Sequence, residues 1–461
     1  MSHKSRVFFF LVFVVIGIMA CGFSSNSAPR LEEAILVTAA PAYEPLAALR
    51  GGERFPEGAQ LKLAHRGSME PLVPGFFATA DADVSFDATH VLLAGKHSAD
   101  DRWQIWELSL ADRSIRKVIA ADTDVIRPLY LPGDRLVYAR KSLTGFQLEA
   151  ASLHGSSGQS DSTDPLPLTY MQASAVPVDV LHDGRILFEA YFPLGSGSTP
   201  ELFLVYSDGS GVESYRCDHG ISRWGGRQLA SGDVVFTHGA SLARFTSPLA
   251  TEVKVAAPVL TPGGTYAGSI VEMPSGAWLL SERDGVDGHF KVRVWSTSQA
   301  RLQTVLEKET EDLVEPVLVM PRTMPNRHPS ALHDWTTANL LALDARQARD
   351  GLLTSPAVLV KLETQDALGH SVTLGTSPVE ADGSFFVKVP GDKPIRFSVL
   401  DKTGAAIRQE HGWFWIRSGE QRICVGCHVG PERAPENQVP AVLLRTTIPV
   451  DLSGVGSTGG H

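Results

Sequence analysis

The amino-acid sequence predicts an all-β protein: a β-propeller, with six blades favoured, followed by a small β-sandwich-like domain. Two observations lead to this prediction. A pattern of turn, short β-rich run, polar gap and second β-rich run recurs through residues 80–300, and repeats of about 40–50 residues with several strands each are typical of propellers. After residue 335, alternating apolar and polar runs are separated by Asp-Gly and Pro turns, as in antiparallel sandwiches.

The N-terminus resembles a bacterial lipoprotein signal over residues 1–21. Lys4 and Arg6 form a positive segment, and residues 7–19 form an uncharged apolar run that is short for a membrane-spanning helix of about 20 residues. The run ends at Ala20 and Cys21, so Cys21 is the expected lipidation site and residues 22–36 the flexible tether. An ordinary cleaved signal and an N-terminal membrane anchor are the alternatives. We expect an exported, periplasm-facing lipoprotein, with the outer membrane favoured over the inner membrane.

The charge and the cysteine count exclude several classes of protein. The 461 residues carry a formal net charge of −10, or −12 once Lys4 and Arg6 are removed with the signal. This acidic balance argues against nucleic acid as a partner and against an electrostatic hold on anionic lipid, so membrane attachment is expected through the N-terminal lipid. The length after processing is enough for two or three domains. With four cysteines in the chain, no internal disulfide framework is available once the motif described below is assigned.

The repeat has a clear register at its first turn. This turn falls at residues 88, 133, 184, 232 and 276, which gives steps of 45, 51, 48 and 44 residues. Glycine occupies four of these positions, as a hairpin turn with positive φ favours. A sixth unit is expected from residues 35–80 together with the run 313–320, which would join the two ends of the ring. The predicted propeller spans residues 37–320, and a plain β-sandwich chain with irregular hairpins is the alternative.

The amino-acid composition changes after the predicted propeller. Residues 321–335 begin with a proline-rich stretch that has too few backbone donors for an interior strand, and they are the expected linker. Residues 336–452 are the expected sandwich-like domain, and the Gly/Ser-rich residues 453–461 a flexible tail. A strand expected at 413–416 places Trp413 and Trp415 on one face and Phe414 and Ile416 on the other.

The chemistry of the chain centres on residues 424–428, Cys-Val-Gly-Cys-His. In this spacing the thiols of Cys424 and Cys427 can each add to a vinyl group of one haem, and His428 follows as the proximal axial ligand of the iron. A disulfide or half of a zinc site is the alternative, but no second CxxC motif is present to complete a zinc site. The motif predicts one covalently attached haem c and makes residues 336–452 a haem-binding domain. Covalent attachment follows export in bacteria, so the motif and the signal agree.

The residues also resemble a known family, the proteins related to the hydrazine synthase alpha subunit. The resemblance is carried by residues 83–87, 103–107, 227–236, 378–385 and 418–424, and it covers roughly residues 75–440. It implies a periplasmic propeller joined to a C-terminal haem-bearing domain. The alpha subunit of that family carries two c-type haems, one of them at the catalytic centre, whereas this sequence has one CxxCH motif. The resemblance therefore does not transfer the reaction.

The function of a single haem depends on its second axial ligand, since His or Met there gives an electron carrier and an empty position gives a site for a small ligand. The resemblance implies a propeller histidine as the cap, which makes His219 the first candidate. Cys217, close to His219 in sequence, is expected to be a buried thiol, with a small metal site at Cys217 and His219 left open. The other candidate axial ligands are His97, Met320, Met324, His328, His333 and His411.

No catalytic motif accompanies the haem motif: the sequence holds no nucleophile elbow and no phosphate-binding glycine loop. The expected function is electron transfer at the periplasmic side of the envelope, with an electron-transfer protein as partner. The alternatives are a haem enzyme with an open axial site, either hydrazine-synthase-like or peroxidatic, and a non-redox propeller scaffold stapled by haem.

Overall fold

The structure is a computed structural model. It describes residues 31–154, 165–194, 197–216, 220–248, 250–255, 263–268, 270–348, 351–353, 355–366, 368–410, 412–425 and 438–454. Cys21, Cys217, His219, His411, Cys427 and His428 lie outside these ranges. Within them the protein is almost wholly β, with one short α-helix, α1 (Ala441–Arg445), and one 3₁₀ turn, η1 (Ala48–Arg50).

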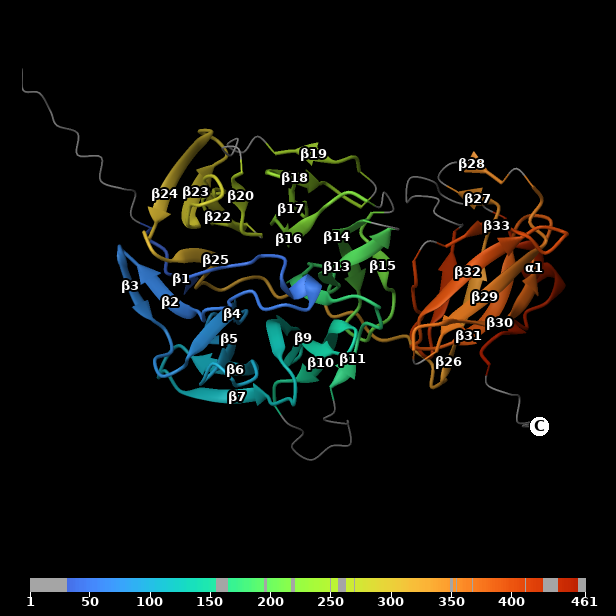
Figure 1. The fold of residues 1–461 in the computed structure, drawn as a ribbon, viewed down its shortest axis with the longest axis horizontal. Helices are drawn as coiled ribbons and strands as arrows, with labels where there is room; N and C mark the ends of the chain where they lie inside the picture. The colour runs from blue at the N-terminus through green and yellow to red at the C-terminus, as the bar shows by residue number, and fades with distance from the viewer. Residues whose placement is uncertain are drawn as a thin grey trace, which may run out of the picture.

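Six antiparallel sheets, counted over the described residues, form a propeller between Ile35 and Leu318 (Figure 1). The first three sheets contain β25 (Asp312–Leu318), β1 (Ile35–Ala40), β2 (Gln60–His65) and β3 (Ser68–Pro71); then β4 (Ala78–Val84), β5 (His90–Lys96), β6 (Gln104–Ser109) and β7 (Ile115–Ile119); then β8 (Val125–Leu131), β9 (Arg135–Ser142), β10 (Gly145–Ser152) and β11 (Leu166–Pro167).

The next three sheets complete the ring. They contain β12 (Ala175–Val180), β13 (Ile186–Leu194), β14 (Gly197–Val205) and β15 (Glu213–Ser214); then β16 (Trp224–Gln228), β17 (Val234–His238), β18 (Ser241–Phe245) and β19 (Val253–Lys254); then β20 (Thr265–Tyr266), β21 (Val271–Glu272), β22 (Trp278–Arg283), β23 (Lys291–Ser296) and β24 (Arg301–Leu306). Every residue of β1 and of β12 is buried, as expected where strands are packed between neighbouring sheets.

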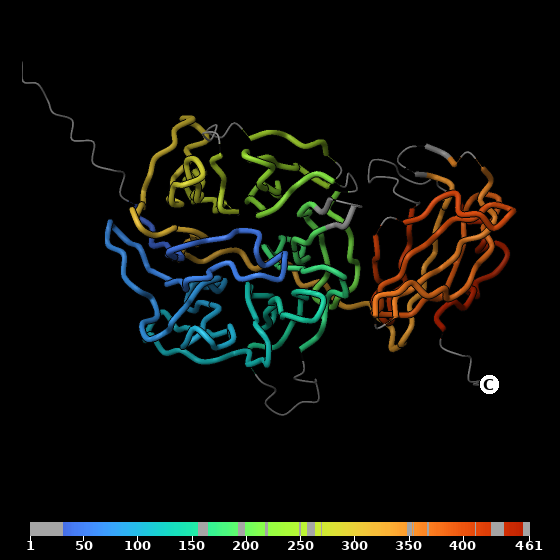
Figure 2. Tube along the Cα trace, viewed as in Figure 1, coloured from blue at the N-terminus to red at the C-terminus, as the bar shows by residue number. Residues whose placement is uncertain are grey.

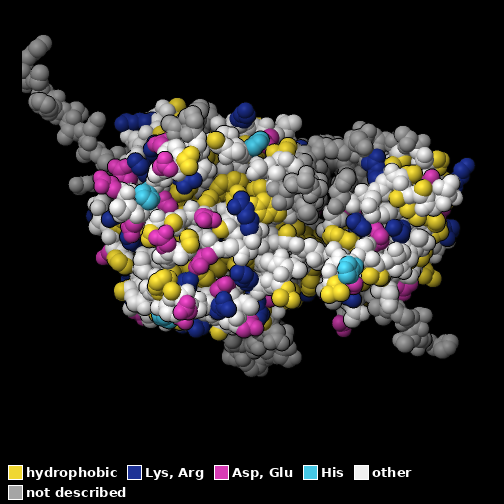
Figure 3. Space-filling model, viewed as in Figure 1, with side chains coloured by type: hydrophobic (Ala, Val, Ile, Leu, Met, Phe, Trp, Pro, Cys, Tyr) yellow, Lys and Arg dark blue, Asp and Glu magenta, His cyan; other side chains and the backbone are white. Residues whose placement is uncertain are grey.

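The ring is closed by the pairing that the sequence led us to expect. β1 pairs antiparallel with β25, from Ile35 opposite Leu318 to Ala40 opposite Asp312, and Figure 2 shows these two segments side by side. Strands from the two ends of the propeller thus share one sheet, so neither end leaves an open edge. On the face of the propeller seen in Figure 3, acidic and basic side chains are interspersed, and neither charge forms a continuous patch.

The repeat register is confirmed at the backbone. All five turn positions have positive φ: 58° at Ala88, 79° at Gly133, 88° at Gly184, 92° at Gly232 and 76° at Gly276. Each lies in the turn between two paired strands of its sheet. Glycine suits this region because it has no Cβ to clash.

The C-terminal residues form a sandwich of two sheets. One contains β34 (Gln421–Cys424), β26 (Thr337–Ala342), β31 (Phe385–Pro390) and β35 (Val450–Asp451); the other contains β30 (Ser371–Pro378), β29 (Leu359–Gln365), β32 (Ile395–Leu400) and β33 (Ala406–Gln409); a small hairpin pairs β27 (Gln347–Ala348) with β28 (Gly351–Leu352). A single apolar cluster joins the two main sheets. The first sheet is mixed and not wholly antiparallel, because β34 and β35 each pair in parallel with an earlier strand.

The connection between the two parts follows the propeller surface. Arg322 Nη2 donates to both carboxylate oxygens of Asp83, at 2.9 and 2.8 Å, and the His328 ring stacks on Tyr206 with centroids 3.9 Å apart. At Gly184 a Cβ would meet the Asn326 carbonyl oxygen at 2.2 Å, so this turn must be glycine for the connection to pass. Residues 321–333 have no helix or strand.

Candidate functional site

The haem motif begins at the end of the last long pairing of the sandwich. Cys424 is the final residue of β34, where it lies opposite Ala342 of β26, and its carbonyl accepts from the Leu343 amide at 2.8 Å. Its side chain is half-buried. Cys427 and His428 lie outside the described residues, so the structure places the first of the three predicted haem-binding residues.

Cys424 borders a cavity of about 320 Å³ between the propeller and the sandwich. The propeller supplies residues of the loop after β11 and of β13, β14 and β15; the sandwich supplies its apolar core face and the segment 412–415. The lining residues are Met171, Gln172, Ala173, Tyr191, Phe203, Val212, Glu213 and Ser214 on one side, and Leu340, Ala342, Ala345, Val360, Phe385, Phe397, Val399, Glu410, Gly412, Trp413, Phe414, Trp415, Arg422 and Cys424 on the other. Such a mostly apolar cavity with a few polar groups is typical of a cofactor site.

The segment before the motif differs from the sequence prediction. Residues 413–416 are not a strand: they make one isolated bridge, between Phe414 and Ile395, and the strand that leads into Cys424 is β34. The expected separation of two faces is met in part, since Trp413 does not accompany Trp415 but lies under Arg396 of β32, 4.5 Å from its guanidinium. Phe414 and Ile416 pack in the sandwich core, whereas Trp415 packs with residues of the third and fourth propeller sheets. Among the described residues this segment makes that single bridge and no continuous ladder of backbone hydrogen bonds, which a strand requires.

Two buried donors at the cavity have no hydrogen-bond partner among the described residues: Trp415 Nε1 and Arg422 Nη2. The other groups of Arg422 are engaged, with Nε donating to Glu420 Oε1 at 2.9 Å and Nη1 to the Trp415 carbonyl at 3.3 Å. Buried donors without a partner indicate a missing acceptor. Apolar walls, a thiol and two unpaired donors match the chemistry of a porphyrin, which has an apolar ring, vinyl groups and two carboxylates. The residues present therefore fit a haem.

The described axial-ligand candidates lie away from this cavity. The His97 ring lies tilted against Phe76 with centroids 4.1 Å apart, His328 stacks on Tyr206, and His333 stacks on Trp335 with centroids 4.2 Å apart. Met320 packs against the apolar cluster around β1 and β22, and Met324 is 54% exposed. These side chains have ordinary packing or surface positions, and none of them lines the cavity.

Sequence reasoning missed Met171, which lines the cavity from the propeller. It lies in a short loop between β11 and β12, and no pattern in the sequence distinguishes that loop from the connections between other sheets. Its importance follows from the packing of the third and fourth sheets against Trp415.

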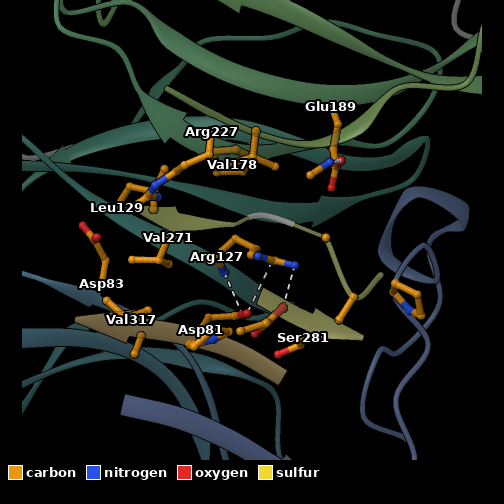
Figure 4. A pocket seen from close by; sticks show the side chains of 18 of the residues that line it. Asp81, Asp83, Arg127, Leu129, Val178, Glu189, Arg227, Val271, Ser281 and Val317 are labelled. Atoms are coloured by element: carbon orange, nitrogen blue, oxygen red, sulfur yellow. Dashed lines mark hydrogen bonds and ion pairs between the residues drawn. The ribbon is translucent and has the colours of Figure 1, made fainter. Parts of the chain in front are cut away.

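A second, polar pocket of about 70 Å³ lies at the axis of the ring (Figure 4). Asp81, Arg127 and Glu315 enter it from β4, β8 and β25, each at a bulge, and all three have left-handed backbone, with φ of 60°, 53° and 54°. Bulges aim a side chain away from the regular pleat, and non-glycine residues in this conformation store strain. The three sheets thus direct charged groups toward one point.

The axial charges are paired with one another and with the connection between β1 and β2. Arg54 from that connection binds Asp81 at 2.5 Å and Glu315 at 2.7 Å, and Arg127 binds Glu315 at 2.7 Å. Burial opposes ionisation of Asp81, but Arg54 and Arg127 outweigh it and lower the pKa of that carboxyl. Burial followed by the charge of Glu315 raises the pKa of Tyr43, which donates to Glu315 at 3.2 Å. These ion pairs hold the connection between β1 and β2 against the sheets that contain β4 and β25.

Two further observations concern membranes and metals. Within the described ranges, no helix has the length and apolar character needed to cross a membrane. The same ranges hold no group of three or more His, Cys, Asp and Glu side chains placed to bind a metal ion.

Comparison with known proteins adds a family and a fold. Residues 347–429 match the family of the hydrazine synthase alpha subunit middle domain. The structure is similar to hydrazine synthase from Kuenenia stuttgartiensis, with a TM-score of 0.76 and 16% identity over 90% of this chain and 71% of that chain. TolB from Acinetobacter baumannii matches with a TM-score of 0.45 and 13% identity over 62% of this chain and 66% of that chain. No curated protein matches the sequence. Residues 347–429 thus match a hydrazine synthase alpha subunit family, and the chain as a whole is similar in fold to hydrazine synthase.

Proposed function

We propose that this chain is an envelope-anchored monohaem c-type cytochrome that transfers electrons at the periplasmic side. The observation that carries the proposal is the position of Cys424, the first residue of CxxCH, on the wall of an apolar cavity between two domains. The match of residues 347–429 to the hydrazine synthase alpha subunit middle domain supports it.

Each part of the site has a stated task. Cys424 and Cys427 would form the two thioether bonds, and His428 would bind the iron as proximal ligand. Trp415 Nε1 and Arg422 Nη2 would donate to the haem carboxylates. The aromatic rings of Trp413, Phe414 and Phe203 would exclude water from the ring faces. When bound, the haem supplies a reversible one-electron centre, and the apolar walls favour a compact site that needs little rearrangement between its two oxidation states.

The proposed organisation follows the sequence. Residues 1–21 are the lipoprotein signal with lipidated Cys21 and residues 22–34 the tether, which ends two residues earlier than expected because Ile35 and Leu36 are buried in β1. Residues 35–320 are the propeller with its six sheets as six blades, residues 321–335 the linker, residues 336–452 the haem domain and residues 453–461 the tail. The lipid places the protein on the periplasmic side, with the outer membrane favoured. An electron-transfer protein is the proposed partner.

The test is the mass and colour of the full chain produced in cells competent for cytochrome c maturation. After denaturation and acid-acetone extraction, the polypeptide should stay coloured and its mass should exceed that of the bare chain by one haem. The double variant Cys424→Ser/Cys427→Ser should lose both features. A colourless wild-type protein with the bare mass would overturn the proposal. Globomycin treatment, which blocks lipoprotein processing, should enlarge the protein in cells if Cys21 is lipidated.

A haem enzyme with an open axial position, hydrazine-synthase-like or peroxidatic, is the second candidate, and the fold similarity to hydrazine synthase over 90% of the chain favours it. The two candidates differ in spectrum. An open position gives a high-spin ferric haem and fast binding of carbon monoxide after reduction, whereas a second protein ligand gives a low-spin haem that resists carbon monoxide.

A further inference from the structure

We infer that the Met171 thioether is the second axial ligand of the haem and that the Gln147 side chain positions it. This inference rests on the proposed function and deepens it, because it names the propeller residue that would complete the iron site. It also changes the first choice from His219, which lies outside the described residues.

The sandwich wall of the cavity carries the haem attachment site, and the propeller wall lies opposite it. Cys424 lies on the sandwich wall, and Cys427 and His428 follow it within four residues. A haem attached at Cys424 would lie in the cavity between this wall and the propeller wall. A second ligand from this chain is therefore expected from the propeller side of the cavity.

On that wall, Met171 is the one described residue with a thioether or imidazole. The other side chains able to bind iron are already engaged: the Tyr191 hydroxyl accepts from Arg50 Nε at 3.2 Å, and Glu213 binds Arg185 at 2.7 Å. Met171 is half-buried and packs against the cluster that contains Trp415. A neutral, polarizable thioether suits such an apolar position.

The side chain of Gln147, in β10, makes several hydrogen bonds to the loop that carries Met171. Gln147 Nε2 donates to the Met171 carbonyl at 3.1 Å and to the Ala173 carbonyl at 3.0 Å, while its Oε1 accepts from the Met171 amide at 3.0 Å. The Thr169 hydroxyl also donates to Gln147 Oε1, at 2.9 Å. This set uses both donors and the acceptor of the amide, so residues 169–173 are fixed on the rigid sheet. Such support is what a ligand needs to stay within bonding range.

The same loop is bound from the sandwich side. The Tyr170 hydroxyl accepts from Arg417 Nη1 at 2.6 Å, and its ring meets Trp415 edge-on with centroids 6.2 Å apart. Met171 thus sits between a glutamine anchored in the propeller and an arginine anchored in the haem domain. Methionine opposite histidine gives a saturated iron with a raised reduction potential, as in cytochromes c, and this favours electron transfer over chemistry at an open site.

The experiment uses the full haem-loaded chain. Wild-type ferric protein should be low-spin and show the near-infrared charge-transfer band of thioether-to-iron ligation. Met171→Leu, which keeps the volume, should lose that band, become high-spin and bind carbon monoxide rapidly when reduced. Met171→His should remain low-spin without the band and should have a lower midpoint potential. Met273→Leu is the matched control, since Met273 is buried in the propeller away from this cavity, and should leave the spectrum unchanged.

The positioning role of Gln147 has its own readout. Gln147→Ala should keep the haem covalently bound but give a mixture of low-spin and high-spin iron, and Met171→His in the same background should restore the low-spin state, since the longer imidazole reach tolerates a looser loop. A Gln147→Ala protein with the wild-type spectrum would overturn the positioning role.

Three results would overturn the Met171 assignment. A haem-loaded wild type without the near-infrared band would do so, and needs no variant that might fail to fold. So would a Met171→Leu protein with the wild-type spectrum. A loss of low-spin character in His219→Ala, with Met171→Leu unaffected, would transfer the role to His219. By contrast, a wild type without covalent haem would overturn the proposed function itself, and the mass measurement separates that result from the others.

Discussion

The Arg417 guanidinium donates from Nη1 to the Tyr170 hydroxyl over 2.6 Å, and the same nitrogen lies 2.9 Å from Asp392 Oδ1. Tyr170 belongs to the propeller and both other residues to the sandwich, so this contact joins the two domains beside the haem motif. The Glu420 side chain adds a second link, since its Oε1 accepts from the Gly211 amide at 3.3 Å. The cavity between the domains therefore has a hydrogen-bonded border as well as apolar walls.

Removal of the Arg417 side chain should loosen the two domains from each other. Arg417→Ala loses a charge-assisted bond to Tyr170 and the ion pair with Asp392, which is about 1.5–3 kcal/mol of stability. Tyr170→Phe removes only the hydroxyl and should cost about 0.5–1.5 kcal/mol. Calorimetry on both variants and on the double variant measures the coupling. Lys393→Ala, at an exposed neighbouring position, is the control and should leave the stability unchanged. If the losses of stability in Arg417→Ala and Tyr170→Phe simply add in the double variant, the contact between the two side chains is contradicted.

Arg422 should raise the reduction potential of the proposed haem. Its Nη2 is an unpaired buried donor at the cavity, and a positive charge near the iron disfavours the more positive ferric state. Arg422→Gln should therefore lower the midpoint potential, by up to about 59 mV, the value of a tenfold change in a one-electron equilibrium. Arg422→Lys keeps the charge and should stay closer to wild type. Spectroelectrochemical titration checks this, and an unchanged or raised midpoint in Arg422→Gln would reject it.

The ion pairs at the axis of the propeller should depend strongly on one another for their contribution to stability. Arg54→Met leaves Asp81 and Glu315 buried with Arg127 as their remaining guanidinium partner, and breaking a buried ion pair typically costs about 3–5 kcal/mol. The double variant Arg54→Met/Asp81→Asn removes one charge of each sign and should recover part of that loss. Urea unfolding of the four proteins of this cycle gives the coupling free energy. A double variant as unstable as the sum of the single ones would show that the two side chains act independently.

Glu189 should make the stability of the propeller depend on pH. The residue is 4% exposed, and its carboxylate accepts from the Gly225 amide at 3.0 Å. Burial raises the pKa of this carboxyl above its ordinary value of 4.5, although Arg127 opposes the shift. A raised folded pKa means that the folded state binds the proton more tightly than the unfolded state, so the stabilisation is complete below pH 4.5 and is lost as the pH rises through the folded pKa.

Glu189→Gln keeps an acceptor for Gly225 but cannot ionise. Relative to wild type, this variant should gain stability as the pH rises from about 4 to 8, by about 1.4 kcal/mol for each pKa unit of the shift. Unfolding free energies at the two ends of this range provide the measurement. Glu307→Gln, at an exposed side chain (60%), is the control. A difference between Glu189→Gln and wild type that stays constant with pH would contradict the raised pKa.

Much of the propeller could be predicted because its signals are local. The turns at Ala88, Gly133, Gly184, Gly232 and Gly276 were expected from the repeat, and all have positive φ. Ring closure by residues 313–320 was expected because an incomplete unit stood at each end of the repeat. By contrast, the expected strand at 413–416 was wrong, since the alternation of its side chains reflects two different neighbours, the propeller and the sandwich core, and not the two faces of one sheet.

The candidate site likewise has features that the sequence predicts and features that only the tertiary structure reveals. The sequence by itself determined the repeat, its turns and the CxxCH motif, because each depends on residues close together in the chain and on backbone preferences that those residues carry with them. The tertiary structure decided that Cys424 faces a cavity shared with the propeller and that Met171, and none of the histidines among the described residues, lines its far wall. It also decided that Arg54, Asp81, Arg127 and Glu315 meet at the axis. These pairs are separated by tens to hundreds of residues, so their contacts arise from the packing of whole sheets and have no trace in the local pattern.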